Sequence, residues 1–515
     1  MNAGVTRTSL RLRPEPRRVI TKLFVPGEER PEHESRSAAV IRRVMALDEE
    51  TVCTVLDRTI RMFAGRHRDV RVTFADHFAS VSHRLSADVE LSESRRLLIG
   101  AYFTHEYSIE GAALCNPSMV AHPDQSGMGP DQLRFVLSVR GIGEGHLSSI
   151  GFRTGVAGPG GALTVDTPPN VVTTGLHRET VHEKSLFQGK LAEFGHDDEV
   201  SAVLNRWLPA RFTDAELDLV LADLHPSLVA RQEAHRTVEL VRRIAACNYT
   251  SEFPDDTVIS GRVLWPTGPS ERQGMEDARF VRFTDDDGER TYYATYTAFD
   301  GVDVAPQLLQ TNDFRTFNVT QTTGSAARNK GMALFPRKIG GRFAALTRGD
   351  GESSAVVTSD DIRTWNGAQP VEVPGRHWDL VQVGNCGSPV ETPEGWLVLT
   401  HGVGPMRVYS MGAMLLDLDH PERVLATLPE PLLLPAATER DGYVPNVVYS
   451  CGALLHGDTL VIPYGASDAS IGLATTSLRG LITALTGKND LQHSLAGTSH
   501  RHSTATEPHS TKDSE

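Results

Sequence analysis

The chain has 515 residues, of which 39% are hydrophobic and 23% are charged. This composition allows one large domain with additions, or two to three smaller domains. Acidic residues outnumber basic residues by 65 to 51, and the formal net charge of -14 argues against a protein that binds nucleic acid through a basic face.

The five cysteines are widely spaced and include no CxxC pair, which indicates free thiols in a reducing compartment and no zinc site. No stretch is long and apolar enough to span a bilayer. The Arg-rich N-terminus lacks the apolar core of a secretory signal. We therefore expect a cytoplasmic protein without a membrane partner.

The N-terminal quarter is expected to contain an arm and a group of helices. Residues 1–34 are predicted to form a flexible arm, and residues 35–90 a helical extension, because apolar residues recur there at a period near 3.6. Asp48 stands where a second helix could begin. Strands are expected from Arg95 onward, in the run RRLLIGAYF.

A repeated pattern fills the main domain, residues 91–475. An apolar strand, a short turn and a second apolar strand recur with a spacing of about 50 residues, which is typical of propeller blades. The five copies end in the polar residues Arg140, Asp300, Arg348, His401 and Asp468. The sequence therefore predicts a mainly β fold, a five-bladed β-propeller whose polar residues meet in one central pocket.

Helical segments interrupt and follow the repeats. A helical insertion is expected at about 176–250, between blades 1 and 2, where Thr213 and Glu216 could form a capping box. Residues 476–487 are predicted to form a C-terminal helix, and residues 488–515, rich in Ser, Thr and His, a disordered tail. The helical segments are expected to pack on the propeller rim or to mediate association into a homo-oligomer.

The densest polar cluster is GMEDARF, with Glu276, Asp277 and Arg279. Adjacent residues of a strand point to opposite faces, so only one carboxylate is expected to face the pocket. The other is expected to pair with Arg279. The alternative interpretation is a surface ion pair.

Several motifs together resemble glycoside hydrolase family 130, the β-mannoside phosphorylases and related mannosidases. They are GMEDARF, TAFDG, NKGMALFPRKIGGRF, SPVETPEGWLVLTHGVG, MGAMLLDLDHP, GYVPNVVYSCG and YGASD. The resemblance covers roughly Cys115 to Ala474 without the helical insertion. It implies a five-bladed propeller that cleaves β-mannosidic linkages with inversion.

The resemblance also implies roles for particular residues. Asp277 would be the general acid and would protonate the leaving oxygen through a hydroxyl of the mannose. Asn116 and Asp468 would bind the mannosyl unit. Further candidates for substrate binding are Glu276, Arg279 and Asp300. A cationic rim, which binds inorganic phosphate in the phosphorylases, would consist of Arg140, Lys330, Arg348 and His401, with Tyr409 beside them.

Two glutamates leave the reaction type open. Glu391 stands where the family's phosphorylases carry Lys; a carboxylate there would repel phosphate and could activate water instead. Glu439 is a second candidate for this general base. The sequence therefore favours hydrolysis of an oligosaccharide or mannoside, with phosphorolysis, which takes phosphate as co-substrate, as the alternative. A non-catalytic carbohydrate-binding propeller is the alternative of another class. Neither reaction requires a metal or an organic cofactor.

Overall fold

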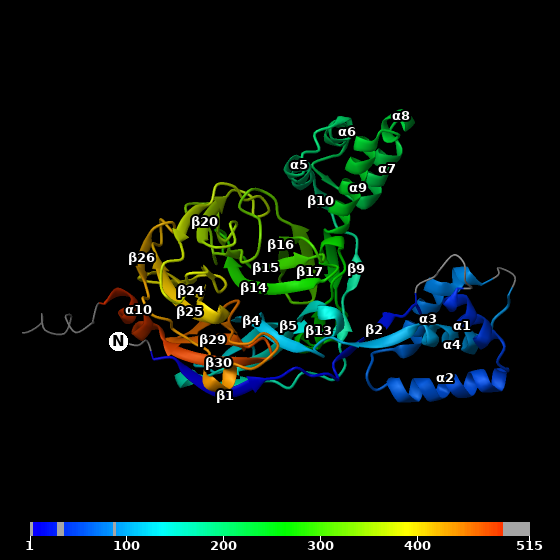
Figure 1. The fold of residues 1–515 in the computed structure, drawn as a ribbon, viewed down its shortest axis with the longest axis horizontal. Coiled ribbons are helices and arrows are strands. Elements are labelled where there is room, and N and C mark those ends of the chain that lie inside the picture. Colours follow the sequence, from blue (N-terminus) through cyan, green and yellow to red (C-terminus); the bar gives the residue numbers. More distant parts are fainter. Residues whose placement is uncertain (1–3, 28–34, 86–88, 488–515) are drawn as a thin grey trace, which may run out of the picture.

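The computed structural model describes residues 4–27, 35–85 and 89–487. The fold is mainly β, and all its α-helices except the C-terminal one form two groups that project from the body of sheets (Figure 1). The tail expected to be disordered, residues 488–515, lies outside the described residues. No helix in the described ranges is both long and apolar enough to cross a membrane.

The strands of the five sequence repeats lie in five antiparallel groups, in chain order. The first group is β4 (Ala113–Ala121), β5 (Leu133–Ile142), β6 (Ser148–Ala157) and β7 (Leu163–Val165). The second is β14 (Gly274–Thr284), β15 (Arg290–Phe299), β16 (Val304–Thr311) and β17 (Thr316–Gln321). The third is β18 (Ala333–Leu334), β19 (Phe343–Thr347), β20 (Ser354–Ser359) and β21 (Gln369–Glu372).

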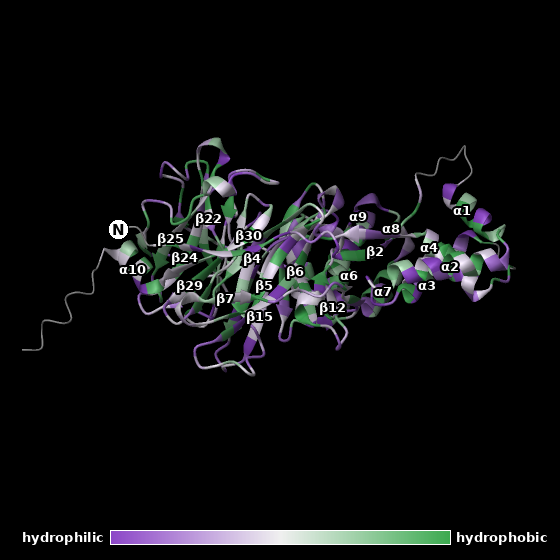
Figure 2. Cartoon of the chain, turned by 90° about the horizontal axis from the view of Figure 1, so that it is seen from below, coloured by the Kyte–Doolittle hydropathy of each residue, from purple (hydrophilic) through white to green (hydrophobic). Residues whose placement is uncertain are grey.

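The last two groups complete the body of sheets. The fourth is β22 (Gln382–Asn385), β23 (Val390–Thr392), β24 (Gly395–Val403), β25 (Tyr409–Leu416) and β26 (Val424–Thr427). The fifth is β27 (Val448–Tyr449), β28 (Leu454–His456), β29 (Thr459–Ala466) and β30 (Ser470–Ser477). Hydrophobic residues, green in Figure 2, recur along these strands, and apolar clusters fill the space between neighbouring groups.

The first two groups are not separate sheets. Strand β6 pairs with β13 (Arg262–Leu264) and, at Ser148 and Gly274, with β14, so both groups belong to one twelve-stranded sheet. This sheet also contains β8 (Thr173–Thr174), β9 (Leu176–Arg178) and β12 (Tyr249–Glu252). The strand groups agree with the sequence repeats, whereas the five-bladed arrangement stays a prediction.

The arm expected to be flexible contains two strands. β1 (Thr6–Leu12) pairs antiparallel with β30 and so covers the edge of the last group. β2 (Val19–Leu23) pairs with β3 (Thr104–Ser108). An exposed edge strand accepts a further strand through its unpaired backbone groups, which explains why the segment TRTSLRL is ordered. Residues 1–3 and 28–34 of the expected arm lie outside the described part.

The helical extension starts and ends at the β2–β3 pair and has its own apolar core. Its helices are α1 (Arg36–Met45), α2 (Glu49–Phe63), α3 (Val70–Val81) and α4 (Glu93–Tyr102). The Asp48 carboxylate caps α2, as the sequence predicts. The strand expected from Arg95 is instead helix α4, because Ser92 caps the first turn and a short apolar run alone does not distinguish strand from helix.

The segment predicted as an insertion, about 176–250, is mostly helical; β9 and β12 at its two ends pair in the twelve-stranded sheet, and two further short strands lie between them. The elements between β9 and β12 are β10 (His182–Glu183), α5 (Lys184–Glu193), α6 (Glu199–Trp207), β11 (Arg211–Phe212), α7 (Asp214–Ala222), α8 (Pro226–Val229) and α9 (Gln232–Ala246). The capping box of Thr213 and Glu216 at the start of α7 is confirmed. The C-terminal helix is α10 (Leu478–Thr486), capped by Ser477.

Candidate active site

A pocket of about 160 Å³ lies where polar residues of all five strand groups meet. Eight of its lining residues are site residues predicted from the sequence: Asn116, Arg140, Asp277, Lys330, Arg348, His401, Tyr409 and Asp468. These residues are far apart in the chain and are brought together by the packing of the sheets. The expectation of one shared pocket therefore agrees with the geometry for these eight.

Backbone irregularities point two of these side chains into the pocket. Asn116 in β4 has φ +48°, Asp277 in β14 has φ +56°, and at both places the strand pairing shifts register. Such a bulge re-aims a side chain, and left-handed backbone is uncommon for residues other than Gly. The Asn116 amide donates a hydrogen bond to Asp277 Oδ1.

One of the two adjacent carboxylates lines the pocket, as expected: it is Asp277, and Glu276 is not among the lining residues. The bulge nevertheless keeps the two side chains close together. Both carboxylates reach Arg140, whose Nη2 lies 2.6 Å from Glu276 Oε1 and whose Nη1 lies 3.3 Å from Asp277 Oδ1. Lys330 Nζ lies 2.6 Å from Glu276 Oε2. Arg140 and Lys330 are therefore largely neutralised by their own partners.

Arg279 does not pair with either carboxylate, contrary to the expectation. It is buried, and its guanidinium donates to the Asn385 carbonyl at 2.8 Å and to the Tyr449 hydroxyl at 2.6 Å. The register shift between Glu276 and Arg279 explains why their side chains do not follow simple strand alternation. Arg279 thus positions Tyr449, which lines the pocket.

The two acids that line the pocket differ in their ionisation. Burial acts to raise the pKa of Asp277, but the charges of Arg140, Lys330 and Arg279 outweigh it and the pKa lies below its ordinary value. Burial raises the pKa of Asp468 to about 6, and the neighbouring Asp277 carboxylate adds to this effect. Asp468 lies in the turn between β29 and β30 with φ +48°.

A second part of the pocket contains two arginines, Arg348 and Arg407. Within the described residues, neither Arg348 nor Arg407 forms an ion pair, and the Nε of Arg348 is buried without a hydrogen-bond partner. Arg348 Nη1 donates to His401 Nε2 at 3.0 Å. Burial and then the Arg348 charge lower the pKa of His401 well below its ordinary value. His401 is therefore neutral, contrary to the expectation that it belongs to the cationic rim. Its ring stacks on Tyr409.

Five of the predicted site residues are not among the lining residues of this pocket: Glu276, Arg279, Asp300, Glu391 and Glu439. Asp300 follows β15 and its carboxylate pairs with Arg243 of helix α9 at 2.7 Å. Glu391 lies in β23, and its carboxylate pairs with Arg337 at 2.8 Å while its side chain is 44% exposed. Neither position places a carboxylate among the lining residues.

The remaining candidate base, Glu439, is buried against the N-terminal strand. It accepts from Arg7, from Arg11 and from the Tyr464 hydroxyl, at 3.0, 2.9 and 2.6 Å. Burial acts to raise the pKa of Glu439, but the hydrogen bonds from Tyr464, Arg11 and Arg7 lower it to about 2. Glu439 therefore attaches β1 to the last strand group, and the general-base positions expected for it and for Glu391 do not agree with the structure.

Several lining residues were missed by the sequence analysis: Gln382, Arg407, Val444, Val447 and Tyr449. Arg407 follows His401 closely, in THGVGPMRVY, on a 3₁₀ turn in which Met406 and Arg407 both have positive φ. Arg407 could have been predicted from the sequence, because it is a basic residue in the turn between two strands that contribute to the pocket. Val444, Val447 and Tyr449 lie in the motif GYVPNVVYSCG, which was quoted for the family resemblance without a role for these residues, whereas Gln382 lies outside the quoted motifs.

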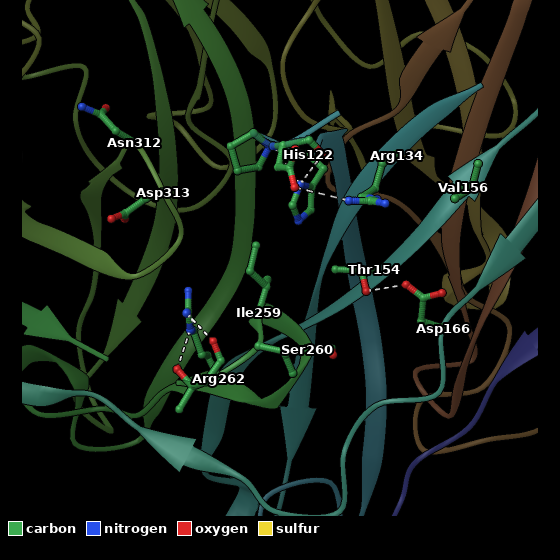
Figure 3. Close-up of a pocket in the computed structure, with 14 residues that line it drawn as sticks. His122, Arg134, Thr154, Val156, Asp166, Ile259, Ser260, Arg262, Asn312 and Asp313 are labelled. Carbon is green, nitrogen blue, oxygen red and sulfur yellow. Dashed lines mark hydrogen bonds and ion pairs between the residues drawn. The ribbon is translucent and has the colours of Figure 1, made fainter. Parts of the chain in front are cut away.

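A larger cavity of about 670 Å³ lies elsewhere, at the ends of β4 and β6 remote from Asn116 and Ser148 (Figure 3). Several of its polar side chains bond to one another or to the backbone. Thr154 donates to Asp166 at 2.7 Å, and Arg262 donates to the Phe314 carbonyl at 2.8 Å. Among the described residues, no group of three or more His, Cys, Asp or Glu side chains is placed to coordinate a metal ion.

Comparison with known proteins relates this chain to enzymes that act on mannosides. Residues 256–486 match the sequence profile of the family described as beta-1,4-mannooligosaccharide phosphorylase, glycoside hydrolase family 130. The 1,2-beta-oligomannan phosphorylase of Thermoanaerobacter sp. (strain X514) is 34% identical over 222 residues, which cover 41% of this chain and 71% of the relative. The beta-1,2-mannobiose phosphorylase of Listeria innocua is 36% identical over 220 residues, 40% of this chain and 59% of the relative.

Among solved structures, that of the Listeria innocua beta-1,2-mannobiose phosphorylase with beta-1,2-mannobiose covers 74% of this chain and 94% of its own, with 21% identity and a TM-score of 0.43. The matched profile includes Asp277, Arg348, His401 and Asp468 but begins after Asn116 and Arg140. The identity to relatives of which this chain covers two thirds or more shows that the chain belongs to glycoside hydrolase family 130 and is an enzyme of the glycosidase or glycoside phosphorylase kind.

Proposed function

We propose that this enzyme is a β-mannoside phosphorylase, which cleaves the glycosidic bond with inorganic phosphate and inverts the anomeric carbon. The observation that carries the proposal is the pocket itself, which Arg348 and Arg407, neither of them in an ion pair within the described part of the chain, line together with the buried Asp277. Phosphate is a multiply charged nucleophile and binds best to several cationic donors. The names of the relatives point to the same reaction.

The positions of the two candidate general bases weigh against hydrolysis. A hydrolase that inverts needs a carboxylate on the far side of the sugar to activate water. Glu391 is paired with Arg337 outside the pocket, and Glu439 is fully engaged by Arg7 and Arg11. We therefore favour the phosphorolytic alternative over the hydrolytic one that the sequence suggested.

The proposed reaction uses Asp277 and the cationic residues on opposite sides of the sugar. A phosphate oxygen, bound near Arg348 and Arg407, bonds to the anomeric carbon while the bond from that carbon to the leaving oxygen breaks. The leaving oxygen takes up a proton that originates at Asp277. The products are mannose 1-phosphate of inverted configuration and the shortened sugar. Asn116 and Asp468 are proposed to bind the hydroxyls of the mannosyl unit.

Phosphate binding also explains how Asp277 can act as an acid. In the free protein the neighbouring cations lower its pKa, which favours the carboxylate. The negative charge of bound phosphate offsets part of the field of Lys330 and Arg140, and the pKa of Asp277 rises. Asp277 therefore carries its proton when phosphate is bound.

The proposal includes the five-bladed propeller as the scaffold. The five antiparallel groups appear in the order of the sequence repeats, and residues from each of them line the same pocket. A radial arrangement brings equivalent strand positions to a common axis. We regard β1 as the strand that completes the fifth blade.

A product analysis tests the function. The full chain is incubated with β-1,2-mannobiose, β-1,4-mannobiose and mannosyl-glucose, each with and without phosphate. We expect mannose 1-phosphate to form only when phosphate is present, with the β-1,2-linked substrate as the first to test because the matched relatives carry that linkage in their names. Free mannose released at the same rate without phosphate would contradict the proposal, and Asp277→Asn, which removes the acid, is the inactive control.

A further inference from the structure

Two aromatic side chains meet at the edge of the candidate active site. His146, in the turn between β5 and β6, bonds through Nδ1 to the hydroxyl of Tyr443, which lies 297 residues further along the chain. Their rings stack with centroids 5.5 Å apart and an interplanar angle of 17°. The contact joins the first strand group to the segment that precedes the fifth.

Both residues are fixed to the elements that carry the site. The turn of His146 is followed by Ser148, whose hydroxyl accepts from Arg140 Nε at 2.9 Å. On the other side, Val444 lines the pocket, and its backbone N–H donates to the Ser467 carbonyl at 3.0 Å, next to Asp468. A movement of either ring would therefore shift residues that line the pocket.

Gly442, which precedes Tyr443, packs closely against the Asp468 turn. A Cβ atom at position 442 would lie 2.4 Å from the Ser467 carbonyl oxygen, so only glycine fits beside the Asp468 turn. On the opposite side, Gly145 and His146 have φ values of +68° and +62°, a left-handed conformation that is unusual for His. The two loops thus present the ring pair in a defined place.

The pair remains open to solvent although its members contact each other. His146 is exposed, and Tyr443 is 42% exposed. An aromatic ring offers an apolar face together with a polar group, and a sugar ring likewise has apolar C–H faces and hydroxyls at its rim. An accessible aromatic pair beside a sugar-cleaving pocket therefore has the chemistry to bind a second sugar.

The position of the pair distinguishes the two ends of the substrate. The residues proposed to bind phosphate, such as Arg348 and Arg407, follow β19 and β24 of the third and fourth groups. His146 lies two residues before Ser148, whose hydroxyl accepts from Arg140, and Arg140 in turn contacts both Glu276 and the acid Asp277. In an inverting displacement the leaving group departs on the side opposite to the nucleophile.

We propose that His146 and Tyr443 form the wall of the subsite that binds the leaving sugar. This inference rests on the proposed function, and it assigns the acceptor specificity of the enzyme to two loops outside the lining residues of the pocket. The Tyr443 ring supplies the contact face, and the bond from His146 fixes its orientation.

The reverse reaction isolates this subsite, because mannose 1-phosphate and an acceptor sugar bind as separate substrates. We expect Tyr443→Ala to raise KM for the acceptor mannose about tenfold while KM for mannose 1-phosphate, and for phosphate in the forward reaction, change less than about twofold. His146→Ala should raise the acceptor KM less than Tyr443→Ala. The matched control is Tyr102→Ala, which removes an equally exposed tyrosine in helix α4.

The outcomes separate the inference from the proposed function. If the wild-type enzyme is a phosphorylase and Tyr443→Ala leaves the acceptor KM unchanged, the subsite assignment is wrong and the proposed function stands. If the wild type shows no phosphate-dependent cleavage, the proposed function fails. The subsite assignment is then still tested by calorimetry, which compares the binding of β-1,2-mannobiose to Asp277→Asn with its binding to the double variant Asp277→Asn, Tyr443→Ala. Equal affinities in that pair would overturn the inference; about tenfold weaker binding with Tyr443→Ala would support it.

Discussion

Asp468→Asn is expected to stabilise the fold while it impairs function. The pKa of the Asp468 carboxyl group is raised from its ordinary value of 3.8 to about 6, because the group is buried and lies near Asp277. Each pKa unit corresponds to about 1.4 kcal/mol, so ionised Asp468 costs about 3 kcal/mol of folding free energy at pH 7. An asparagine avoids this cost and also accepts the positive φ of this turn.

The sign and the pH window follow from proton binding. The folded protein binds the Asp468 proton more tightly than the unfolded chain, so stability falls as the pH rises from about 4 to about 6. The advantage of Asp468→Asn should therefore be largest at pH 7, about 3 kcal/mol, fall to roughly half of that at pH 5 and be small at pH 4.

Urea denaturation of both proteins between pH 4 and pH 8 measures this difference. Glu391→Gln serves as the control, since its exposed pair with Arg337 should contribute less than about 1 kcal/mol at any of these pH values. If Asp468→Asn is less stable than the wild type at pH 7, or if its advantage is the same at pH 4, the reasoning about burial is refuted.

Three further predictions concern the reaction. Arg348→Ala and Arg407→Ala should each raise KM for phosphate about 10- to 100-fold, whereas Arg337→Gln, outside the pocket, should not; steady-state kinetics at varied phosphate decides this, and unchanged KM values would exclude both arginines from the phosphate site. Glu391→Gln should retain at least about half of the wild-type kcat, and a loss of activity would restore this residue as a candidate base. Saturating phosphate should shift the basic limb of the pH–rate profile to higher pH, because phosphate raises the pKa of Asp277; a limb that does not move would contradict that electrostatic coupling.

The sequence predicted the local strand pattern and the residue types of the site better than their partners. Asn116, Asp277 and Asp468 were identified from short motifs, and all three line the pocket. Glu391 and Glu439 were misplaced because the arginines that engage them, Arg337 and Arg7, are 54 and 432 residues away. Ion pairs over such separations depend on tertiary packing, which a strand pattern does not contain.

Irregularities in strand pairing could not be predicted from the sequence either. Strand alternation predicts opposite faces for neighbouring residues, and the bulge at Asp277 overrides it so that Glu276 and Asp277 share Arg140. The strand formed by residues 6–12 was missed for a related reason. A polar segment such as TRTSLRL becomes a strand only because β30 offers it an edge.

The source of the oxygen in the cleaved product tests the central claim most directly. The enzyme is incubated with β-1,2-mannobiose and phosphate in ¹⁸O-labelled water, and the products are analysed by mass spectrometry and ³¹P NMR. Attack by phosphate predicts mannose 1-phosphate that carries no ¹⁸O from the solvent. Free mannose labelled with ¹⁸O at the anomeric carbon, formed as the main product, would show that water is the nucleophile and would contradict the account.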